Sequence, residues 1–306
     1  MSAAPEGLRP DYSLARLTTV RTGGAADWFG RPGDEESLLA ALRWADAEGL
    51  PVGVVGSGSN LLVADDGFRG LALKLGGDLA AIEREGERVV CGGGYRFPSA
   101  AAKTAGWGLS GLEFGVNIPG TAGGAVRMNA NAYGGQLAEA LEWVDVATAA
   151  GTDRRTPDQL GFEYRRSNLR EGEIVARASF QLTAADPDEI RATLASMRER
   201  RREAQPSGIK TFGSTFTNPP GDAPGVEGRT AGQLLDAAGA RGLAVGGARL
   251  SEKHANFVEN TGNATTAEVL ELMATARRLV HERFGVVLEP EVQLLGEVRW
   301  PEGWDL

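Results

Sequence analysis

The stretch Val55-Gly-Ser-Gly-Ser-Asn-Leu-Leu62 is the most informative part of this 306-residue chain. It lies between two apolar runs, 51–55 and 71–75, and each run predicts a buried strand. Glycines beside Ser and Asn at a strand end can turn several backbone N–H groups to one side, and an anion can bind in the nest that results. On its residues alone, a tight turn explains the stretch equally well.

The stretch differs from the two common phosphate-binding loops. A Rossmann fingerprint has glycine at its sixth position and a helix after it, whereas here that position is Leu61 and no helix is predicted to follow. A P-loop ends in Gly-Lys-Ser or Gly-Lys-Thr, which is absent after Gly58. We therefore expect an anion cradle that does not open a helix.

Two further stretches have a similar composition. Residues 117–125 read Asn-Ile-Pro-Gly-Thr-Ala-Gly-Gly-Ala and continue into the Asn-rich residues 129–134, and residues 213–219 read Gly-Ser-Thr-Phe-Thr-Asn-Pro. Close approach of backbone to a diphosphate or an aromatic ring is one interpretation, and irregular structural loops are the other. Three such stretches, with the single serine Ser214 in the third, indicate a large phosphate-bearing cofactor and a catalytic donor.

Composition and charge exclude several classes of function. The net charge is −9, whereas general binding of nucleic acid or a membrane surface needs a basic field, so we expect neither partner. The single cysteine, Cys91, excludes an internal disulfide, and no spacing of His, Cys and acidic residues suggests a metal. No apolar run approaches the ~18 residues of a membrane span, and the N-terminus lacks a signal pattern. We expect a cytoplasmic protein, a monomer or weak dimer.

The hydrophobic pattern predicts an α+β protein with mixed sheets. A domain boundary is expected at Gln205-Pro-Ser-Gly208. Helices are predicted at 34–49, 98–106, 186–202, 230–238 and 265–284, and strands at 51–55, 71–75, 88–91, 141–148, 173–182 and 286–295.

Together with other short motifs, these stretches resemble the UDP-N-acetylmuramate dehydrogenases, also called UDP-N-acetylenolpyruvoylglucosamine reductases. Any one motif is common, whereas the ordered set is highly specific and spans nearly the whole chain. The matching segments are 21–24, 56–60, 118–124, 164–167, 213–216, 218–219, 251–257 and 288–292. No Tyr follows Tyr164, and Ser214 comes only 49 residues after Arg165, so the chain resembles the short form of the family, which lacks a Tyr-bearing loop.

The resemblance implies a fold and a domain order. A two-subdomain FAD-binding fold of the vanillyl-alcohol-oxidase-like (PCMH) type would be joined to a C-terminal α/β substrate-binding domain. The expected bounds are 1–76 for the first FAD-binding subdomain, 77–203 for the second and 204–295 for the substrate-binding domain. Residues 296–306 would return to the first subdomain.

The resemblance also implies FAD as the cofactor and NADPH as the co-substrate. The histidines, His254 and His281, lie outside the FAD motifs, and Cys91 is expected to be a buried strand residue, so we expect FAD to be held non-covalently. The cofactor-binding residues that carry over from the family are Arg21, Gly23, Gly56, Ser57, Gly58, Ser59, Asn60, Leu61, Asn117, Pro119, Gly120, Gly123, Gly124 and Asn129.

The implied reaction reduces UDP-N-acetylglucosamine enolpyruvate to UDP-N-acetylmuramate. Hydride would pass from NADPH to flavin N5 and then to the terminal vinyl carbon, leaving negative charge that spreads into the substrate carboxylate as an enolate. Such a reaction needs stabilisation of that charge and a proton for the adjacent carbon. We expect Arg165 and a protonated Glu291 to stabilise the enolate, and Ser214 to donate the proton. The expected substrate-binding residues are Tyr164, Asn218, Lys253 and His254, although for His254 the sequence favours a loop-fixing hydrogen bond over contact with substrate.

Two positions depart from the family pattern and leave alternatives open. Thr217 and Ala204 stand where the family often has basic residues, so the group that binds the UDP diphosphate is not assigned; Lys210 and the basic cluster 198–202 are candidates. An FAD oxidase of sugars or hydroxy acids is the main competing function, but it would lack the Gly-Ser-x-Phe and Glu-Pro-Glu-Val pair. A flavin-binding module without catalysis, or a Rossmann dehydrogenase without flavin, fits the sequence less well.

Overall fold

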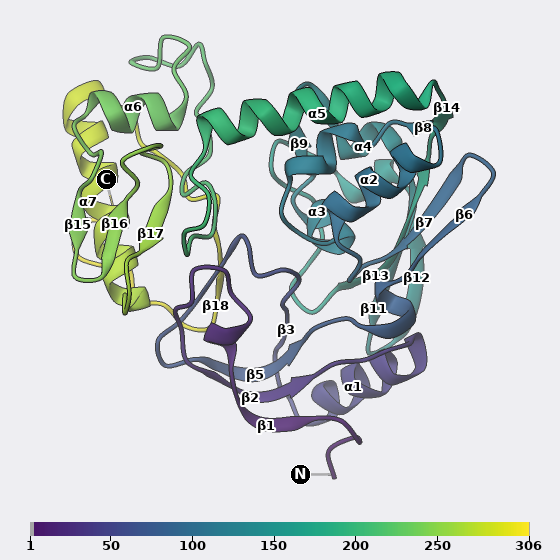
Figure 1. Ribbon diagram of the computed structural model, residues 1–306. Coiled ribbons are helices and arrows are strands. Elements are labelled where there is room, and N and C mark those ends of the chain that lie inside the picture. Colours follow the sequence, from purple (N-terminus) through teal and green to yellow (C-terminus); the bar gives the residue numbers. More distant parts are fainter. Residues whose placement is uncertain (1–2, 306) are drawn as a thin grey trace. The chain divides into compact units, whose positions relative to one another are not determined.

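The computed structural model describes residues 3–305, which form two compact units (Figure 1). The first unit contains the chain up to Tyr12, residues 27–57 and residues 69–203. The second contains residues 13–26 and 58–68 together with the chain from Ala204 onward. Two short N-terminal segments therefore belong with the C-terminal third of the chain, which the sequence did not indicate.

An antiparallel sheet of five strands is the centre of the first unit. Its order is β12 (Gly151–Arg155), β11 (Leu141–Thr148), β13 (Ile174–Gln181), β7 (Arg88–Gly92) and β6 (Ile82–Glu85). In β13, Val175, Ala178 and Phe180 enter the core beneath the helices, whereas Ile174 and Ala176 enter a second core on the other face. The strand is therefore covered on both faces, and the register shift in its pairing with β11, between Arg177 and Val175, is where the side-chain alternation changes.

Helices cover the two faces of this sheet unequally. Figure 1 shows α2 (Phe97–Gly106), α3 (Ala122–Arg127), α4 (Leu137–Ala140) and α5 (Pro187–Ala204) grouped on one face. On the other face, α1 (Glu35–Ala47) shares a core with the second sheet of the fold. That sheet has the order β1 (Arg9–Ser13), β2 (Ala25–Gly30), β5 (Phe68–Leu73) and β3 (Val52–Val54). The short pairs are β8 (Leu109–Ser110) with β14 (Thr183–Ala184), and β9 (Asn131–Ala132) with β10 (Gly135–Gln136).

The second unit is built around the long helix α7 (Thr266–Phe284). Thr265 and Glu268 form a capping box at its start, and Gly285 ends it in the left-handed conformation. The Asp65 carboxylate accepts the N–H groups of Thr266 and Ala267 at 2.8 and 2.9 Å, so this early segment is held at the helix N-terminus. The other elements are α6 (Ala231–Ala237), the sheet β15 (Ala244–Val245), β16 (Ala248–Leu250) and β17 (Val258–Asn260), and the parallel pair β4 (Leu61–Val63) with β18 (Gln293–Leu295).

Most of the predicted elements form, and two expectations fail. All five predicted helices are confirmed, with ends that differ by only a few residues. The predicted strand 286–295 is largely wrong, since only β18 pairs as a strand; Pro290 within it has no N–H to donate and makes an isolated bridge to Phe216. Helix α3 was not predicted, although Thr121 caps it. The remaining helices are short 3₁₀ turns at Leu14–Arg16, Gly77–Ala80, Glu113–Asn117 and Pro157–Leu160.

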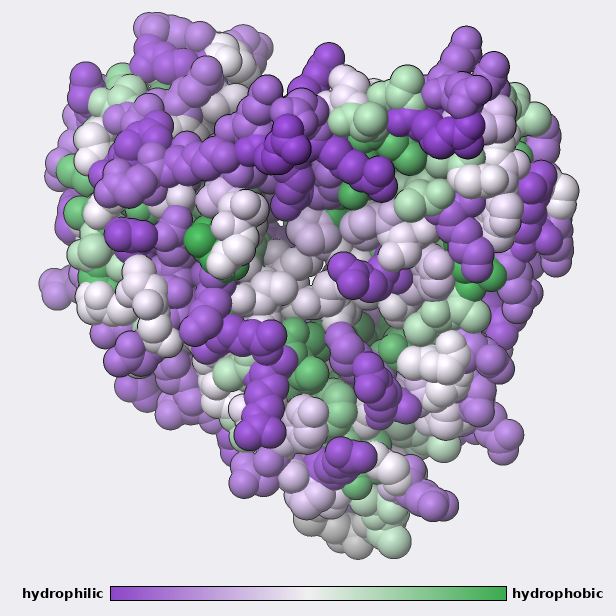
Figure 2. Space-filling model, in the orientation of Figure 1, coloured by the Kyte–Doolittle hydropathy of each residue, from purple (hydrophilic) through white to green (hydrophobic). Residues whose placement is uncertain are grey.

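Apolar side chains are gathered inside the units. On the face drawn in Figure 2, hydrophilic side chains predominate and apolar ones form only small patches. Among residues 3–305, no helix has both the length and the apolar composition needed to cross a membrane.

Candidate functional site

Two of the three glycine-rich stretches meet in the first unit. A Cβ at Gly56 would lie 2.8 Å from Thr121 Oγ1, so the backbone of the first stretch packs directly against the second. Thr121 in turn accepts the N–H of Gly124, and the N–H of Gly123 donates to Gly93 O at 2.8 Å. Lys74 donates to Gly56 O, and burial, followed by the neighbouring Arg31, lowers the pKa of Lys74. Two loops far apart in the sequence therefore form one polar backbone surface with a cation beside it.

The remainder of the first stretch lies in the second unit, against the third. Gly58 has φ +66°, and a Cβ there would lie 2.1 Å from Leu17 O, so only glycine fits without rearrangement. Its carbonyl accepts the N–H and the hydroxyl of Thr19 at 2.9 and 3.0 Å. A Cβ at Gly213 would be 3.6 Å from Ser59 O, which places the start of the third stretch beside Ser59.

The Arg21–Gly24 motif packs against the strand that follows the first stretch. Arg21 has φ +66°, and its N–H donates to Thr18 Oγ1 at 3.1 Å. Its guanidinium donates to Arg16 O. Gly23 lies against Val63, the last residue of β4, and Leu61 is the first residue of the same strand. The predicted cofactor residues of the second unit thus share one strand and its flanking turns.

Ser214 and Glu291 lie on adjacent extended segments of the second unit. Ser214 pairs with Phe257 on one side, and the next residue, Thr215, donates its N–H to Asn256 O at 2.8 Å. On the other side, Glu291 donates its N–H to Thr215 O at 2.9 Å. The structure therefore places side by side two backbone segments that are far apart in the sequence, one carrying Ser214 and the other Glu291.

Asn256 fixes the segment that carries Ser214, a role that the sequence did not reveal. Asn256 is 4% exposed, and its side chain both accepts a hydrogen bond from the backbone of Phe216 and donates one to it. Oδ1 accepts the N–H of Phe216 at 2.9 Å, and Nδ2 donates to Phe216 O at 2.8 Å. The only signal in the sequence was the position of Asn256 within the matching segment 251–257.

Asn60 also has an unexpected structural role. The sequence placed it among the cofactor-binding residues. In the structure its Nδ2 donates to Glu291 O at 3.1 Å, and its own carbonyl accepts the N–H of Gln293 at 3.1 Å. The first glycine-rich stretch therefore holds the segment of Glu291 in place.

Arg165 lies at the tip of a two-residue hairpin in the first unit. Glu163 and Arg166 exchange backbone hydrogen bonds of 3.1 and 3.2 Å, and Arg165 between them has φ +58°. Its Nη1 donates to Asn131 O at 3.1 Å, and its guanidinium lies 5.2 Å from the centre of the Tyr164 ring. Tyr164 is 50% exposed, so this tip presents an aromatic ring and a permanent cation at the surface of its unit.

The Asn-rich segment after α3 contains an unusual buried amide. Asn129 is fully buried with φ +38°, and its Nδ2 donates to Glu163 O at 3.0 Å. Its Oδ1 has no hydrogen-bond partner among the described residues. A buried acceptor without a donor is costly, and it is the kind of atom that a bound ligand satisfies.

The predicted residue Asn117 joins the second stretch to α5. Its Nδ2 donates to Tyr133 Oη at 2.9 Å and to Met197 O at 2.7 Å, and its carbonyl accepts from Arg201. Burial lowers the pKa of Arg201, while Tyr133 acts to raise it. Pro119 and Gly120 follow Asn117 as the exposed turn before α3, and nothing lies within 4 Å of a Cβ at Gly120.

Three predicted substrate-binding residues are also tied to their own surroundings. Asn218 Oδ1 accepts the N–H of Ala231 at 3.0 Å, at the start of α6. The N–H of Lys253 donates to Ser251 Oγ at 3.3 Å. His254 Nδ1 accepts the N–H of Asn256 at 3.3 Å, and burial lowers the pKa of His254, so its imidazole is neutral at pH 7. The loop-fixing alternative for His254 has this direct support.

Comparisons with known protein families agree with the two parts of the chain. The model described as UDP-N-acetylenolpyruvoylglucosamine reductase, C-terminal domain, matches residues 205–295. The model described as FAD binding domain matches residues 26–156. The expected fold class, an FAD-binding fold joined to a C-terminal substrate-binding domain, is confirmed.

Individual proteins match over almost the whole chain. UDP-N-acetylenolpyruvoylglucosamine reductase of Rubrobacter xylanophilus is 42% identical over 289 residues, which are 94% of this chain and 95% of that protein. The protein of the same name from Anaeromyxobacter sp. is 43% identical over 287 residues, 94% of this chain and 88% of that protein. The crystal structure of the reductase from Thermus caldophilus has a TM-score of 0.80 and 36% identity, covering 94% of this chain and 99% of that chain. The chain therefore belongs to the UDP-N-acetylenolpyruvoylglucosamine reductase family, whose members are FAD-containing oxidoreductases.

Proposed function

We propose that this protein reduces UDP-N-acetylglucosamine enolpyruvate to UDP-N-acetylmuramate, a step of peptidoglycan precursor synthesis, with NADPH as the reductant. The observation that carries the proposal is the hydrogen bond from Glu291 N–H to Thr215 O, which pairs the segment of Glu291 with the segment of Ser214. A proton donor and a carboxyl group are what reduction of an enolpyruvyl carbon needs, and an oxidase would not need this pair. Family membership supports the same activity.

The residues present fit FAD as the cofactor. The absence of a side chain at Gly56 lets two glycine-rich loops meet at Thr121, and Asn129 Oδ1 is a buried acceptor without a donor among the described residues. Cys91 is buried, and burial raises the pKa of its thiol to about 12, so the thiolate needed for a covalent link is absent at neutral pH. We therefore infer non-covalent binding.

In the first unit, FAD would be held by the two glycine-rich loops that meet at Gly56 and Thr121. The proposed cofactor contacts are the residues named from the sequence in 21–23, 56–61, 117–124 and at Asn129. When bound, FAD supplies the hydride chemistry between NADPH and the substrate. The net reaction adds a hydride equivalent to the terminal vinyl carbon and a proton to the adjacent carbon, while NADPH becomes NADP⁺.

Ser214 is the proposed proton donor. A serine hydroxyl is a weak acid, so it can protonate only a strongly basic carbon and only from a fixed position. The hydrogen bonds of Thr215 on both of its sides, and those of Asn256 to Phe216, hold the backbone of this segment. Ser214 itself is only partly buried, so solvent can return the proton that it gives away.

Arg165 and Glu291 are proposed to stabilise the enolate. A guanidinium stays protonated at all physiological pH values and can bind a carboxylate with two parallel hydrogen bonds. Arg165 is partly buried and its Nη1 is anchored on Asn131 O, which limits the orientations of the cation. Glu291 is held by its backbone through Asn60 and Thr215, which fixes the position of the residue.

An anaerobic two-step experiment tests the proposal. The purified protein is reduced with NADPH until the visible flavin band is bleached, and UDP-N-acetylglucosamine enolpyruvate is then added. We expect the oxidised flavin band to return only on adding this substrate, with one UDP-N-acetylmuramate formed per flavin. A flavin that is reoxidised only by oxygen would identify an oxidase, and a protein without flavin absorbance after reconstitution with FAD would contradict the cofactor assignment.

A further inference from the structure

The backbone at Arg165 needs support from its surroundings. A φ of +58° is sterically disfavoured for any residue with a Cβ. Its hairpin, residues 163–166, has only two backbone hydrogen bonds of its own, 3.1 and 3.2 Å long. A conformation of this kind persists only where neighbouring groups impose it. Neighbouring groups must therefore hold the hairpin in place.

Three contacts attach the hairpin to the residues that follow α3. Ser167 Oγ donates to Arg127 O at 2.8 Å, and Asn129 Nδ2 donates to Glu163 O at 3.0 Å. Arg165 Nη1 donates to Asn131 O at 3.1 Å. The contacts lie before, at and after the tip, and their partners are Arg127 at the end of α3, Asn129 in the turn that follows and Asn131 at the start of β9. The segment 127–131 therefore holds the hairpin by hydrogen bonds before, at and after its tip.

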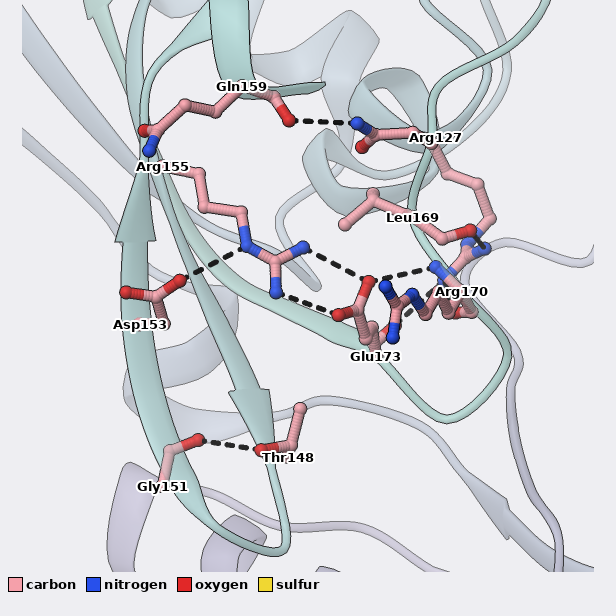
Figure 3. A network of polar contacts seen from close by, with 10 residues as sticks. Arg127, Thr148, Gly151, Asp153, Arg155, Gln159, Leu169, Arg170 and Glu173 are labelled. Carbon is pink, nitrogen blue, oxygen red and sulfur yellow. Dashed lines mark hydrogen bonds and ion pairs between the residues drawn. The ribbon is translucent and has the colours of Figure 1, made fainter. Parts of the chain in front are cut away.

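Arg127 extends this attachment to the chain that leaves the hairpin. Figure 3 shows its guanidinium beside the turn 169–173. Nη1 donates to Leu169 O at 3.2 Å, and Nη2 donates to Arg170 O at 3.2 Å and to Glu173 O at 2.7 Å. Burial lowers the pKa of Arg127, while Glu173 and Glu171 act to raise it, so a desolvated cation is matched chiefly by backbone carbonyls. This is a structural use of a guanidinium, since its planar fork can reach three acceptors at once.

The far end of the same turn is fixed by an ion pair. Arg155 donates to Glu173 through Nη2 at 2.7 Å and through Nη1 at 3.1 Å, and Glu173 also accepts the N–H of Arg170 at 2.8 Å (Figure 3). The Glu173 side chain is 12% exposed, and the hydrogen bonds from Arg155 hold the pKa of Glu173 below its ordinary value despite burial. The turn thus offers Arg127 a rigid set of carbonyls.

We propose that Arg127 is a positioning residue for Arg165, acting through the turn 169–173 and through its own carbonyl on Ser167. This inference rests on the proposed role of Arg165 in stabilising the substrate enolate. Arg127 binds backbone at every contact described above and sets the direction in which the hairpin presents the guanidinium of Arg165. Displacing a catalytic group by about 1 Å can slow a reaction about 100-fold. Loss of the planar guanidinium of Arg127 should therefore slow the reaction in addition to lowering stability.

The test compares half-reactions of Arg127→Lys, which keeps the charge but loses the planar fork. We expect FAD content and flavin reduction by NADPH within about twofold of the parent protein, and reoxidation by the enolpyruvyl substrate about 10- to 100-fold slower. Arg166→Ala is the matched control, because Arg166 adjoins Arg165 and its side chain makes an exposed ion pair with Glu163 at 3.8 Å, while its hairpin hydrogen bonds come from the backbone, which alanine keeps. It should leave both half-reactions unchanged.

A double-mutant cycle separates positioning from general damage. If Arg127 acts through Arg165, Arg127→Lys should slow reoxidation little further in an Arg165→Ala background. Equal slowing in both backgrounds, or slowing of both half-reactions together, would overturn the inference. Reoxidation at the parental rate in Arg165→Ala would instead contradict the proposed function of Arg165. If Arg127→Lys does not fold, Ser167→Ala carries the test, with about three- to tenfold slower reoxidation expected and an unchanged rate contradicting the inference.

Discussion

Replacing Gly58 by alanine should destabilise the protein more than the same change at Gly86, a glycine with a similar backbone conformation. Gly58 has φ +66°, and an added Cβ would lie 2.1 Å from Leu17 O and 2.7 Å from Thr18 Cα. Gly86 has nearly the same φ, +67°, with nothing within 4 Å of its Cβ position. Alanine would therefore have the same backbone strain at both positions. Only at position 58 would its Cβ also clash with neighbouring backbone atoms.

The expected loss in the free energy of unfolding is the sum of the backbone strain and of the cost of the clash. Placing alanine in the left-handed region costs about 1–2 kcal/mol, and both variants lose this amount. Gly58→Ala must also push apart two backbone segments, which adds about 1–3 kcal/mol, as overpacking of a tight interior does. We expect Gly86→Ala to lower the free energy of unfolding by about 1–2 kcal/mol, and Gly58→Ala by about 2–5 kcal/mol.

Urea unfolding of the two variants, followed by circular dichroism, measures this difference, and equilibrium titration with FAD measures the effect on the cofactor. We expect Gly58→Ala to weaken FAD binding and Gly86→Ala to leave it unchanged. Equal losses of stability in the two variants would refute the argument, because the contact with Leu17 and Thr18 would then not be what requires glycine at position 58.

Three further predictions concern the second unit. Asn256→Ala should lower the free energy of unfolding by about 2–4 kcal/mol, because it leaves the buried N–H and carbonyl of Phe216 unpaired; a loss below 1 kcal/mol in urea unfolding would contradict this. Since the folded pKa of His254 lies below its ordinary value of 6.5, its contribution to stability is present above pH 6.5 and is lost as the pH falls through the folded pKa. His254→Gln should remove that part of the pH dependence of the melting temperature, and an unchanged profile would count against it. Asn60→Ala should slow flavin reoxidation by the substrate about tenfold, because Glu291 loses one of its backbone anchors. An unaltered rate of reoxidation in stopped-flow absorbance would contradict this.

The sequence predicted elements whose signals are local. Helix α7 was predicted at 265–284, and the structure forms it there, with Thr265 and Glu268 capping its start and Gly285 ending it. Helix α3 was missed because it has six residues, two of them glycines, and depends on Thr121 and on tertiary contacts. The assignment of 13–26 and 58–68 to the second unit was beyond prediction, because it depends on contacts such as Asp65 with the start of α7, formed across long stretches of chain.

The candidate site was predictable only in part. The ordered motifs named Ser214, Arg165 and Glu291 through the family resemblance, but no local pattern gave the adjacency of Ser214 and Glu291, which arises from long-range backbone pairing. The left-handed backbone of Arg165 has no sequence signal either, because arginine is not a residue that favours it. The role of Asn60 in holding Glu291 was hidden by its position in a glycine-rich loop, which suggested the cofactor instead.

The central claim is that Ser214 donates the proton in reduction of the enolpyruvyl group. The most direct measurement is anaerobic stopped-flow absorbance of Ser214→Ala, with flavin reduction by NADPH and reoxidation by UDP-N-acetylglucosamine enolpyruvate recorded separately. The account predicts reduction at the parental rate and reoxidation slower by at least about 100-fold, the lower end of the usual contribution of a general acid. Reoxidation at the parental rate, or an equal loss in both half-reactions, would contradict it.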